Sequence, residues 1–324
     1  MVLMRRALFI ALFLFAPFMA SASLIPTNAG NLELVATPQY PQPGESTALI
    51  VNNTTGDAAV ANYVWSVNGK TVLSGIGQNQ LSLVAPTSGQ DTVDVTVTDA
   101  SGAVLGTLST IINPATVDIV WEGQTSVPPL YIGRPLPNGA SPITVLAVPH
   151  IAVGGATVPD SSLIYTWSVN SIPKAAVSGY GKSSATITPP NFGQAFTVSI
   201  HAETADGRGG ADGSATIQPQ TPTALIYQNA PLLGMRFDKI IAGSFPMSET
   251  EASFIAYPLF VNNPTALTEQ WTLNGAPFSV DPSQPQNVTF RKTGSGSGTS
   301  AVAFSFNNPS GFLESGSASF TLTF

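Results

Sequence analysis

The most constraining feature of this chain is a tryptophan phrase that occurs three times. Trp65, Trp167 and Trp271 follow one another at intervals of 102 and 104 residues (167 − 65 and 271 − 167). They lie in the phrases Tyr-Val-Trp-Ser-Val-Asn-Gly, Tyr-Thr-Trp-Ser-Val-Asn and Gln-Trp-Thr-Leu-Asn-Gly. A phrase that recurs at a nearly fixed interval indicates one structural unit repeated along the chain. About a hundred residues is the size of one β-sandwich, so we expect one tryptophan in the core of each of three sandwiches.

A second element repeats in the first two units only. Leu-Ser-Gly-Ile-Gly contains Gly75 and Gly77, and 104 residues later Val-Ser-Gly-Tyr-Gly contains Gly179 and Gly181. These glycines are predicted to form equivalent turns. The third unit lacks the element and instead has the run Gly-Ser-Gly-Ser-Gly at 294–298, for which we expect a loop. The third unit is therefore predicted to be a divergent terminal repeat.

Strict alternation of apolar and polar residues predicts strands in all three units. The run Val93, Val95 and Val97 alternates with threonine and aspartate, and the chain ends with an alternating run that includes Phe320 and Phe324. Turn-forming Asp-Gly, Asn-Pro and Ser-Gly pairs follow such runs, and the residues after the first 22 show no helical apolar period. Further alternating runs cover 196–202 and 302–306.

These patterns predict an all-β chain of three tandem immunoglobulin-like β-sandwiches after an N-terminal signal peptide. Proline and glutamine interrupt the strand pattern near 113–115 and 218–222, where we place the boundaries. Short linkers that contain proline favour a semi-rigid rod. The predicted segments are a signal peptide at 1–22 and sandwich domains at 23–114, 115–219 and 220–324.

The first 22 residues have the pattern of a secretory signal peptide. Arg5 and Arg6 precede a short apolar run that Pro17 interrupts, and Ala20-Ser21-Ala22 supplies the small residues of a cleavage site. The run is shorter than the ~20 residues that span a bilayer. We therefore expect export to the extracellular space or the cell envelope, with an uncleaved N-terminal anchor as the alternative, and no membrane span in the mature chain.

Composition excludes several classes of function. The chain has no cysteine, which excludes disulfides, thiolate metal sites and lipoprotein attachment, and in an exported protein favours a bacterial source. Charged residues make up 9% of the chain and the formal net charge is −7. The chain thus lacks the stripe of basic residues that nucleic-acid binding requires, and we expect no nucleic-acid partner. Sparse charge also leaves strand edges weakly protected against self-association or addition of a partner strand.

The first unit most resembles the PKD-like domains of bacterial tandem immunoglobulin-like surface proteins. The resemblance rests on Pro-Gln-Pro-Gly-Glu-Ser at 41–46, the tryptophan phrase at 63–69 and the alternating strand and turn at 94–102. Asn68-Gly69 stands where PKD domains have Gly-Asp-Gly, so the unit is PKD-like rather than PKD. The resemblance covers about two-thirds of the residues after the leader. It implies a surface spacer, an adhesive module or a substrate-binding accessory.

Catalytic and metal-binding patterns are weak. The chain has two histidines, His150 and His201, and lacks a Gly-x-Ser-x-Gly elbow, a His-Glu-x-x-His pair and a phosphate loop. The acidic groups Asp91, Asp94, Asp99 and Glu203, Asp206, Asp212 could supply oxygens to calcium, but neither forms a known calcium loop. We predict no enzyme activity, no catalytic residue, no metal site and no cofactor.

Tyr131, Tyr180 and Tyr227 lie near predicted strand ends or loops and could form a platform for a saccharide, or could equally cap a core. We therefore interpret the chain as an exported, non-enzymatic structural or binding protein, an adhesion or envelope scaffold, with a protein or saccharide partner at the cell surface. The alternative is a carbohydrate-binding accessory protein of an envelope or polysaccharide-processing system.

Overall fold

The structure is a computed structural model that describes residues 31–54, 58–230, 232–309, 311 and 314–324. It consists of β-strands with three short 3-10 turns, which confirms the predicted all-β class. Contacts between Cα atoms divide the chain into two compact units. Among the described residues, the first comprises 31–39, Thr47–Leu83 and Thr92–Thr110, and the second comprises Tyr40–Ser46, Val84–Asp91 and Ile111–Phe324. The predicted signal peptide at 1–22 lies outside the described residues.

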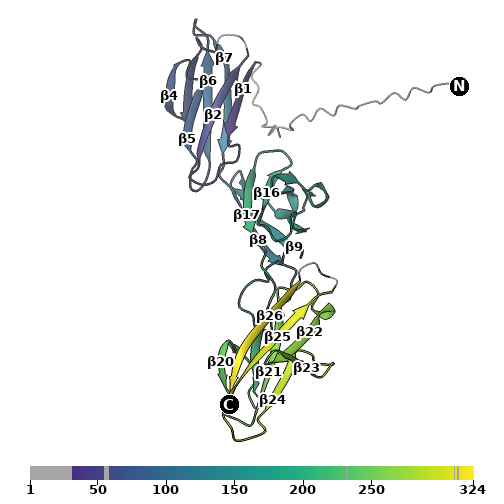
Figure 1. Cartoon of the computed structure of the whole chain (residues 1–324). Coiled ribbons are helices and arrows are strands. Elements are labelled where there is room, and N and C mark those ends of the chain that lie inside the picture. Colours follow the sequence, from purple (N-terminus) through teal and green to yellow (C-terminus); the bar gives the residue numbers. More distant parts are fainter. Residues whose placement is uncertain (1–30, 55–57, 231, 310, 312–313) are drawn as a thin grey trace, which may run out of the picture. The chain divides into compact units, whose positions relative to one another are not determined.

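The first pair of sheets forms the first sandwich. One sheet has the strand order β1-β2-β5 and the other has the order β4-β3-β6-β7 (Figure 1). Side chains alternate along each strand, so that Leu34, Val51, Trp65 and Val95 are buried. The strands are β1 (Leu32–Thr37), β2 (Ser46–Asn53), β3 (Asn62–Val67), β4 (Lys70–Ile76), β5 (Gln80–Val84), β6 (Asp91–Thr98) and β7 (Val104–Ile112).

The second pair of sheets repeats this plan with a broken fourth strand. One sheet has the order β15-β9-β8, and the other has the order β13-β12-β16-β17 with β14 paired to β12. The two-stranded hairpin β10-β11 and the turn η1 lie between β9 and β12 and connect the two sheets, and the turn η2 lies between β13 and β14. The elements are β8 (Thr116–Gly123), β9 (Ile143–His150), β10 (Ala152–Val153), β11 (Ala156–Thr157), η1 (Asp160–Ser162), β12 (Leu163–Val169), β13 (Ile172–Pro173), η2 (Ala175–Val177), β14 (Gly179–Tyr180), β15 (Ser184–Ile187), β16 (Phe196–Thr204) and β17 (Gly210–Ile217).

The third pair of sheets is the largest, with four strands in the order β19-β18-β21-β24 and five in the order β20-β26-β25-β22-β23. Strand β20 pairs parallel to β26, whereas the other pairings among the described residues of this sandwich are antiparallel. The elements are β18 (Thr223–Ala230), β19 (Gly234–Ile240), β20 (Gly243–Pro246), β21 (Glu251–Leu259), η3 (Pro264–Ala266), β22 (Thr268–Leu273), β23 (Ala276–Phe278), β24 (Asn287–Arg291), β25 (Thr299–Asn307) and β26 (Ser315–Thr323).

The three sandwiches share the immunoglobulin-like arrangement. In each, one sheet holds the tryptophan strand (β3, β12 or β22) beside β6, β16 or β25, and the other sheet contains the antiparallel set β1-β2-β5, β8-β9-β15 or β18-β21-β24. The tryptophans occupy the same register: Trp65 pairs with Val95, Trp167 with Ile200 and Trp271 with Phe304. The chain is therefore a series of immunoglobulin-like sandwiches, and the domain boundaries at 114/115 and 219/220 stay predictions.

The cores differ in composition. Aliphatic side chains and Trp167 fill the second core, which also includes Phe196. Aromatic side chains fill the third, where the rings of Trp271 and Phe304 lie 5.0 Å apart and those of Phe254 and Phe320 lie 4.7 Å apart. Such offset and tilted aromatic pairs stabilise a core beyond the area that they bury.

One glycine sets how closely the two sheets of the second sandwich approach at their edge. A Cβ atom on Gly213 in β17 would lie 2.3 Å from the backbone oxygen of Val117 in β8. This position therefore excludes any side chain. Among the described residues, no helix is both long enough and apolar enough to cross a membrane.

Candidate functional site

The three tryptophans of the repeated phrase lie in the cores. Trp65, Trp167 and Trp271 each have 0% of their surface exposed. Each indole N–H donates a hydrogen bond to a backbone oxygen: to Gln78 at 2.8 Å, Lys182 at 2.9 Å and Pro285 at 3.1 Å. A buried indole needs such an acceptor. Each tryptophan therefore stabilises the core of its own sandwich and is not accessible to a ligand.

The asparagine that follows each tryptophan by three residues has a role that the sequence reasoning missed. Asn68, Asn170 and Asn274, here called the turn asparagines, have φ angles of 51°, 48° and 51°. Their Oδ1 atoms accept hydrogen bonds from the backbone N–H groups of Thr92, Thr197 and Ala301, at 2.9, 2.9 and 2.8 Å. Their own N–H groups donate to the oxygens of the same three residues. The turn therefore joins the end of the tryptophan strand to the start of its neighbour.

The repeated glycines form equivalent turns. Gly77 and Gly181 have φ angles of 71° and 68°, which favour glycine. Their N–H groups donate to Ala61 and Leu163, both at 2.9 Å. Gly75 and Gly179 also have positive φ angles, of 156° and 132°. A search for Asn followed by Gly would have found the turns at 68–69 and 274–275.

The two histidines pair with carboxylates on strand surfaces. The ring of His150 lies 3.1 Å from Asp118. His201 lies 2.8 Å from Asp212 and 3.6 Å from Glu203. The hydrogen bond that the His201 ring donates to Asp212 raises the pKa of His201 above its usual 6.5, with smaller contributions from the charges of Asp212 and Glu203, while burial opposes the shift.

The acidic residues considered for calcium serve local turns and pairs. Asp99 accepts hydrogen bonds from Ser101 and Ala103 in its own turn, and these bonds lower its pKa. Hydrogen bonds from Thr204 and then Arg208 lower the pKa of Asp206 to about 2. In the part of the chain that the structure describes, no three His, Cys, Asp or Glu side chains form a group that could hold a metal ion.

The three tyrosines do not form one exposed platform. Tyr180 is 63% exposed in β14. Tyr227 is 5% exposed and lies in an aromatic cluster, with ring centroids 5.3 Å from Phe237 and 6.0 Å from Tyr257. Burial, with smaller contributions from Tyr131 and Tyr257, raises its pKa. The ring of Tyr131 lies 6.2 Å from that of Phe260, and Tyr180 belongs to the second sandwich.

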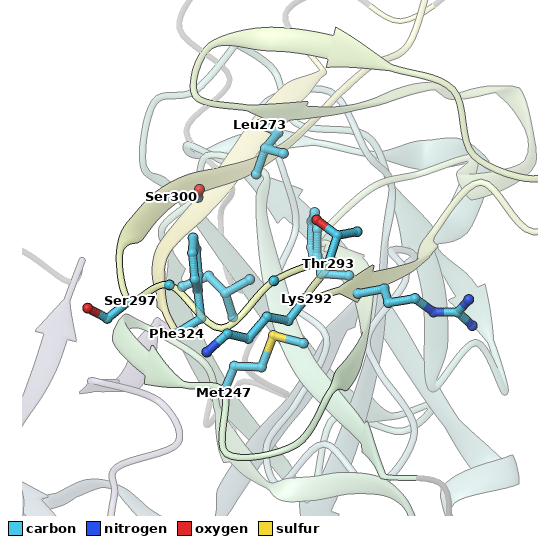
Figure 2. Close-up of a pocket in the computed structure, with 12 residues that line it drawn as sticks. Met247, Leu273, Lys292, Thr293, Ser297, Ser300 and Phe324 are labelled. Atoms are coloured by element: carbon cyan, nitrogen blue, oxygen red, sulfur yellow. The ribbon is translucent and has the colours of Figure 1, made fainter.

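The third sandwich has a pocket at one end of its core (Figure 2), with a volume of about 330 Å³. It lies where β24, the segment 292–298 and the starts or ends of β22, β25 and β26 meet. This volume is at the lower end of small-molecule sites. Its lining is apolar at Met247, Leu273, Phe290, Leu322 and Phe324 and polar or small at Arg291, Lys292, Thr293, Gly294, Gly296, Ser297 and Ser300.

A comparison with the second sandwich explains why the core is open here. Ser300 faces inward, because it has the same parity on β25 as the buried Val302 and Phe304. Ser300 lies four residues before Phe304, which pairs with Trp271, and Phe196 lies four residues before Ile200, which pairs with Trp167. Ser300 and Phe196 therefore occupy equivalent positions. Phe196 is 2% exposed and fills its position. The small Ser300 and the glycine-rich segment above it leave the corresponding space unfilled.

The lining side chains come from both sheets. Figure 2 shows Lys292 extended beneath the glycine-rich segment, on the same side as Phe324 and Met247, whereas Ser297 points away from the other labelled residues. Phe324 is 36% exposed, so part of its ring is open to a ligand. A Cβ atom on Gly298 would lie 3.2 Å from that ring, so this glycine gives the ring its room.

A second cavity, of about 390 Å³, is lined mainly by asparagines and Glu314. Glu314 is 5% exposed. Its oxygens accept hydrogen bonds from the side chains of Asn138 and Asn308 and from the backbone N–H of Asn262. Both carboxylate oxygens are thus already bonded within the protein. The segment between β8 and β9, which contains Asn138, is thereby attached to the third pair of sheets.

Comparisons with known proteins found no matching family model and no matching curated protein. Solved structures with some similarity include the three N-terminal domains of the bacteriophage RB49 highly immunogenic outer capsid protein (12% identity, 90% of this chain and 98% of that chain, TM-score 0.26). The central fibronectin-III array of RIM-binding protein gives 11% identity, 92% and 98% coverage and a TM-score of 0.33. Fibronectin(III)-like modules of Clostridium thermocellum CbhA give 8% identity over 58% of this chain and 94% of that chain, with a TM-score of 0.29. These TM-scores are too low to support a fold assignment, so the immunoglobulin-like assignment rests on the sheet order described above.

Proposed function

We propose that the chain is an exported, non-enzymatic protein of the cell envelope or extracellular space. In this proposal its sandwiches, at 23–114, 115–219 and 220–324, act as a structural array, and the third binds a partner at the cell surface. The observation that carries the proposal is the pocket at Ser300, where the second sandwich has the core-filling Phe196. A protein that served only as a spacer would be more stable if a larger side chain filled this space.

The surroundings of the histidines support a non-catalytic function. In the described part of the chain, the hydrogen bonds of His150 and His201 go to carboxylates and not to a serine or threonine hydroxyl. Nucleophilic catalysis by a hydroxyl needs a base within hydrogen-bond reach. Neither histidine lines the pocket of the third sandwich.

Binding of the fluorescently labelled full chain to cells of the source organism tests the proposal. The test variant is Ser300→Phe, which puts into the third sandwich the residue that the second already has. The matched control is Ser305→Phe, at an exposed, outward-facing position of the same strand. We expect Ser300→Phe to remain folded and to lose binding, and Ser305→Phe to bind as the unchanged chain does. Equal binding by the two variants would refute a binding role for the pocket.

Export is tested separately. The N-terminal sequence of the protein recovered from the envelope or the medium is expected to begin at Ser23, after the predicted cleavage site. Recovery of membrane-bound protein with Met1 intact would support the alternative of an uncleaved anchor.

A carbohydrate-binding accessory protein is the second candidate function. The pocket combines the part-exposed ring of Phe324 with the hydroxyl-bearing residues Thr293 and Ser300. Saccharides offer an apolar C–H face and several hydroxyls, which such a lining can match. Binding to a glycan array that Ser300→Phe abolishes and Tyr180→Ala leaves unchanged would favour this function over a protein-binding scaffold.

A further inference from the structure

The charged side chains that line the pocket of the third sandwich are both cations. Arg291 and Lys292 line it, and none of the lining residues is Asp or Glu. This is unusual for a chain with 18 acidic and 11 basic residues. Arg291 pairs with Glu251. Lys292 is half-buried and, among the described residues, forms no ion pair, so its charge is available to a ligand.

The segment above the pocket offers a second set of donors. The backbone N–H of Lys292 donates to Thr250 and that of Gly298 donates to Phe324. Between them, the five amide groups of residues 293–297 donate no hydrogen bond to any described protein group. Backbone N–H groups need a partner, which is water or a ligand when the protein supplies none. Consecutive backbone amides beside a cation favour an anion.

From this arrangement we infer that the pocket binds an acidic saccharide, with the sugar carboxylate held by Lys292 and by backbone amides of the lining residues Thr293, Gly294, Gly296 and Ser297. The inference rests on the proposed function and adds the ligand class. The ring of Phe324 contacts the C–H face of the sugar, and the hydroxyls of Thr293 and Ser300 bond to sugar hydroxyls. The side chain of Ser297 points away in Figure 2 and has no assigned contact.

The size of the pocket agrees with this ligand. A cavity of about 330 Å³ suits one or two sugar rings better than a folded protein segment. The mixture of apolar floor, hydroxyls and a single available ammonium group also differs from the arginine clusters that recognise phosphorylated motifs. One sugar unit would enter the pocket, and the rest of the polymer would continue outside.

The test measures binding of a galacturonic acid trimer and of its methyl ester to the full chain by titration calorimetry. The ester has the same rings and hydroxyls but no charge. We expect the acid to bind at least about tenfold more tightly than the ester, the effect of one charge-assisted hydrogen bond. We expect Lys292→Gln to remove this preference and Lys292→Arg to retain most of it. The control Lys239→Gln, at an exposed lysine that does not line the pocket, should bind as the unchanged chain does.

Three results would overturn the inference: equal affinity for acid and ester, no binding of either, or tighter binding of an acidic peptide of the same charge. If Ser300→Phe abolishes binding to cells but the trimer does not bind, the proposed function stands and the ligand class is wrong. If Ser300→Phe leaves binding to cells intact, the proposed function itself fails. Amide shifts of residues 293–297 on adding trimer, measured by NMR, would locate the contact independently of the variants.

Discussion

Replacing the turn asparagine of the second sandwich, Asn170, with alanine is expected to lower its free energy of unfolding by about 2 kcal/mol. About half comes from the backbone, because φ is 48° and the left-handed region costs alanine about 1 kcal/mol or more. The other half is the hydrogen bond from the Thr197 N–H to Oδ1, 2.9 Å long, for which a net value of about 1 kcal/mol is typical.

Two further substitutions separate the contributions. Asn170→Gly keeps the freedom to adopt a positive φ and loses only the side-chain acceptor, so we expect a loss of about 1 kcal/mol. Asn170→Asp keeps the acceptor and should remain close to the unchanged chain. In the same turn Ser171 has a φ of 65°, where the other sandwiches have Gly69 and Gly275. Ser171→Gly should therefore stabilise the sandwich by roughly 0.5–1 kcal/mol.

Hydrogen exchange measured by mass spectrometry at increasing urea concentration is the appropriate assay, because peptides from each sandwich report its own unfolding. A single spectroscopic transition would mix the sandwiches, since chains of several domains need not unfold in two states. A loss below about 0.5 kcal/mol for Asn170→Ala would refute the reasoning. Equal losses for the alanine and glycine variants would show that the positive φ contributes nothing.

Three other outcomes are expected. Trp271→Ala should lower the stability of the third sandwich by about 3–5 kcal/mol and Trp271→Phe by less, as followed by urea-dependent hydrogen exchange; equal losses would contradict a packing role. The pKa of His201 is raised in the folded state, so its contribution to stability is full below about 6.5 and is lost as the pH rises through the raised pKa. Urea midpoints of His201→Gln should therefore depend less on pH across this window, and an unchanged pH dependence would count against the pair with Asp212. Gly213→Ala should destabilise the second sandwich, because the new Cβ would lie 2.3 Å from a backbone oxygen of β8; a midpoint like that of the unchanged chain would disprove the close approach.

Strand alternation and the tryptophan phrase predict the all-β class, since both express local rules. Every second residue of a strand faces the core, and Val93, Val95 and Val97 are all 0% exposed, as their alternation predicts. The turn asparagines Asn68 and Asn274 were equally local and could have been found, because Asn-Gly favours two successive positive φ angles, whereas Asn170 is followed by Ser171.

The candidate site depends on distant contacts. Ser300 has the inward parity of Val302 and Phe304, which the alternating run already indicates, but its equivalence to the core-filling Phe196 follows only when Trp271 is paired with Phe304 and compared with the pair of Trp167 and Ile200. The bond between Asn138 and Glu314 joins residues 176 positions apart, which no local pattern predicts. The sequence also left open whether Tyr227 is an exposed platform residue or a core residue. The ring contacts with Phe237 and Tyr257 decide for the buried position.

The sequence by itself thus determined the repeat, the strand class and the central position of the tryptophans, because these follow from side-chain alternation and turn chemistry within about ten residues. Only the tertiary structure decided that the third core is open where the second is closed by Phe196, and that Lys292 and the exposed glycine-rich segment border the opening. A cavity is the space that packing leaves unfilled. It therefore depends on which side chains of both sheets meet, and strand pairing between distant segments decides that.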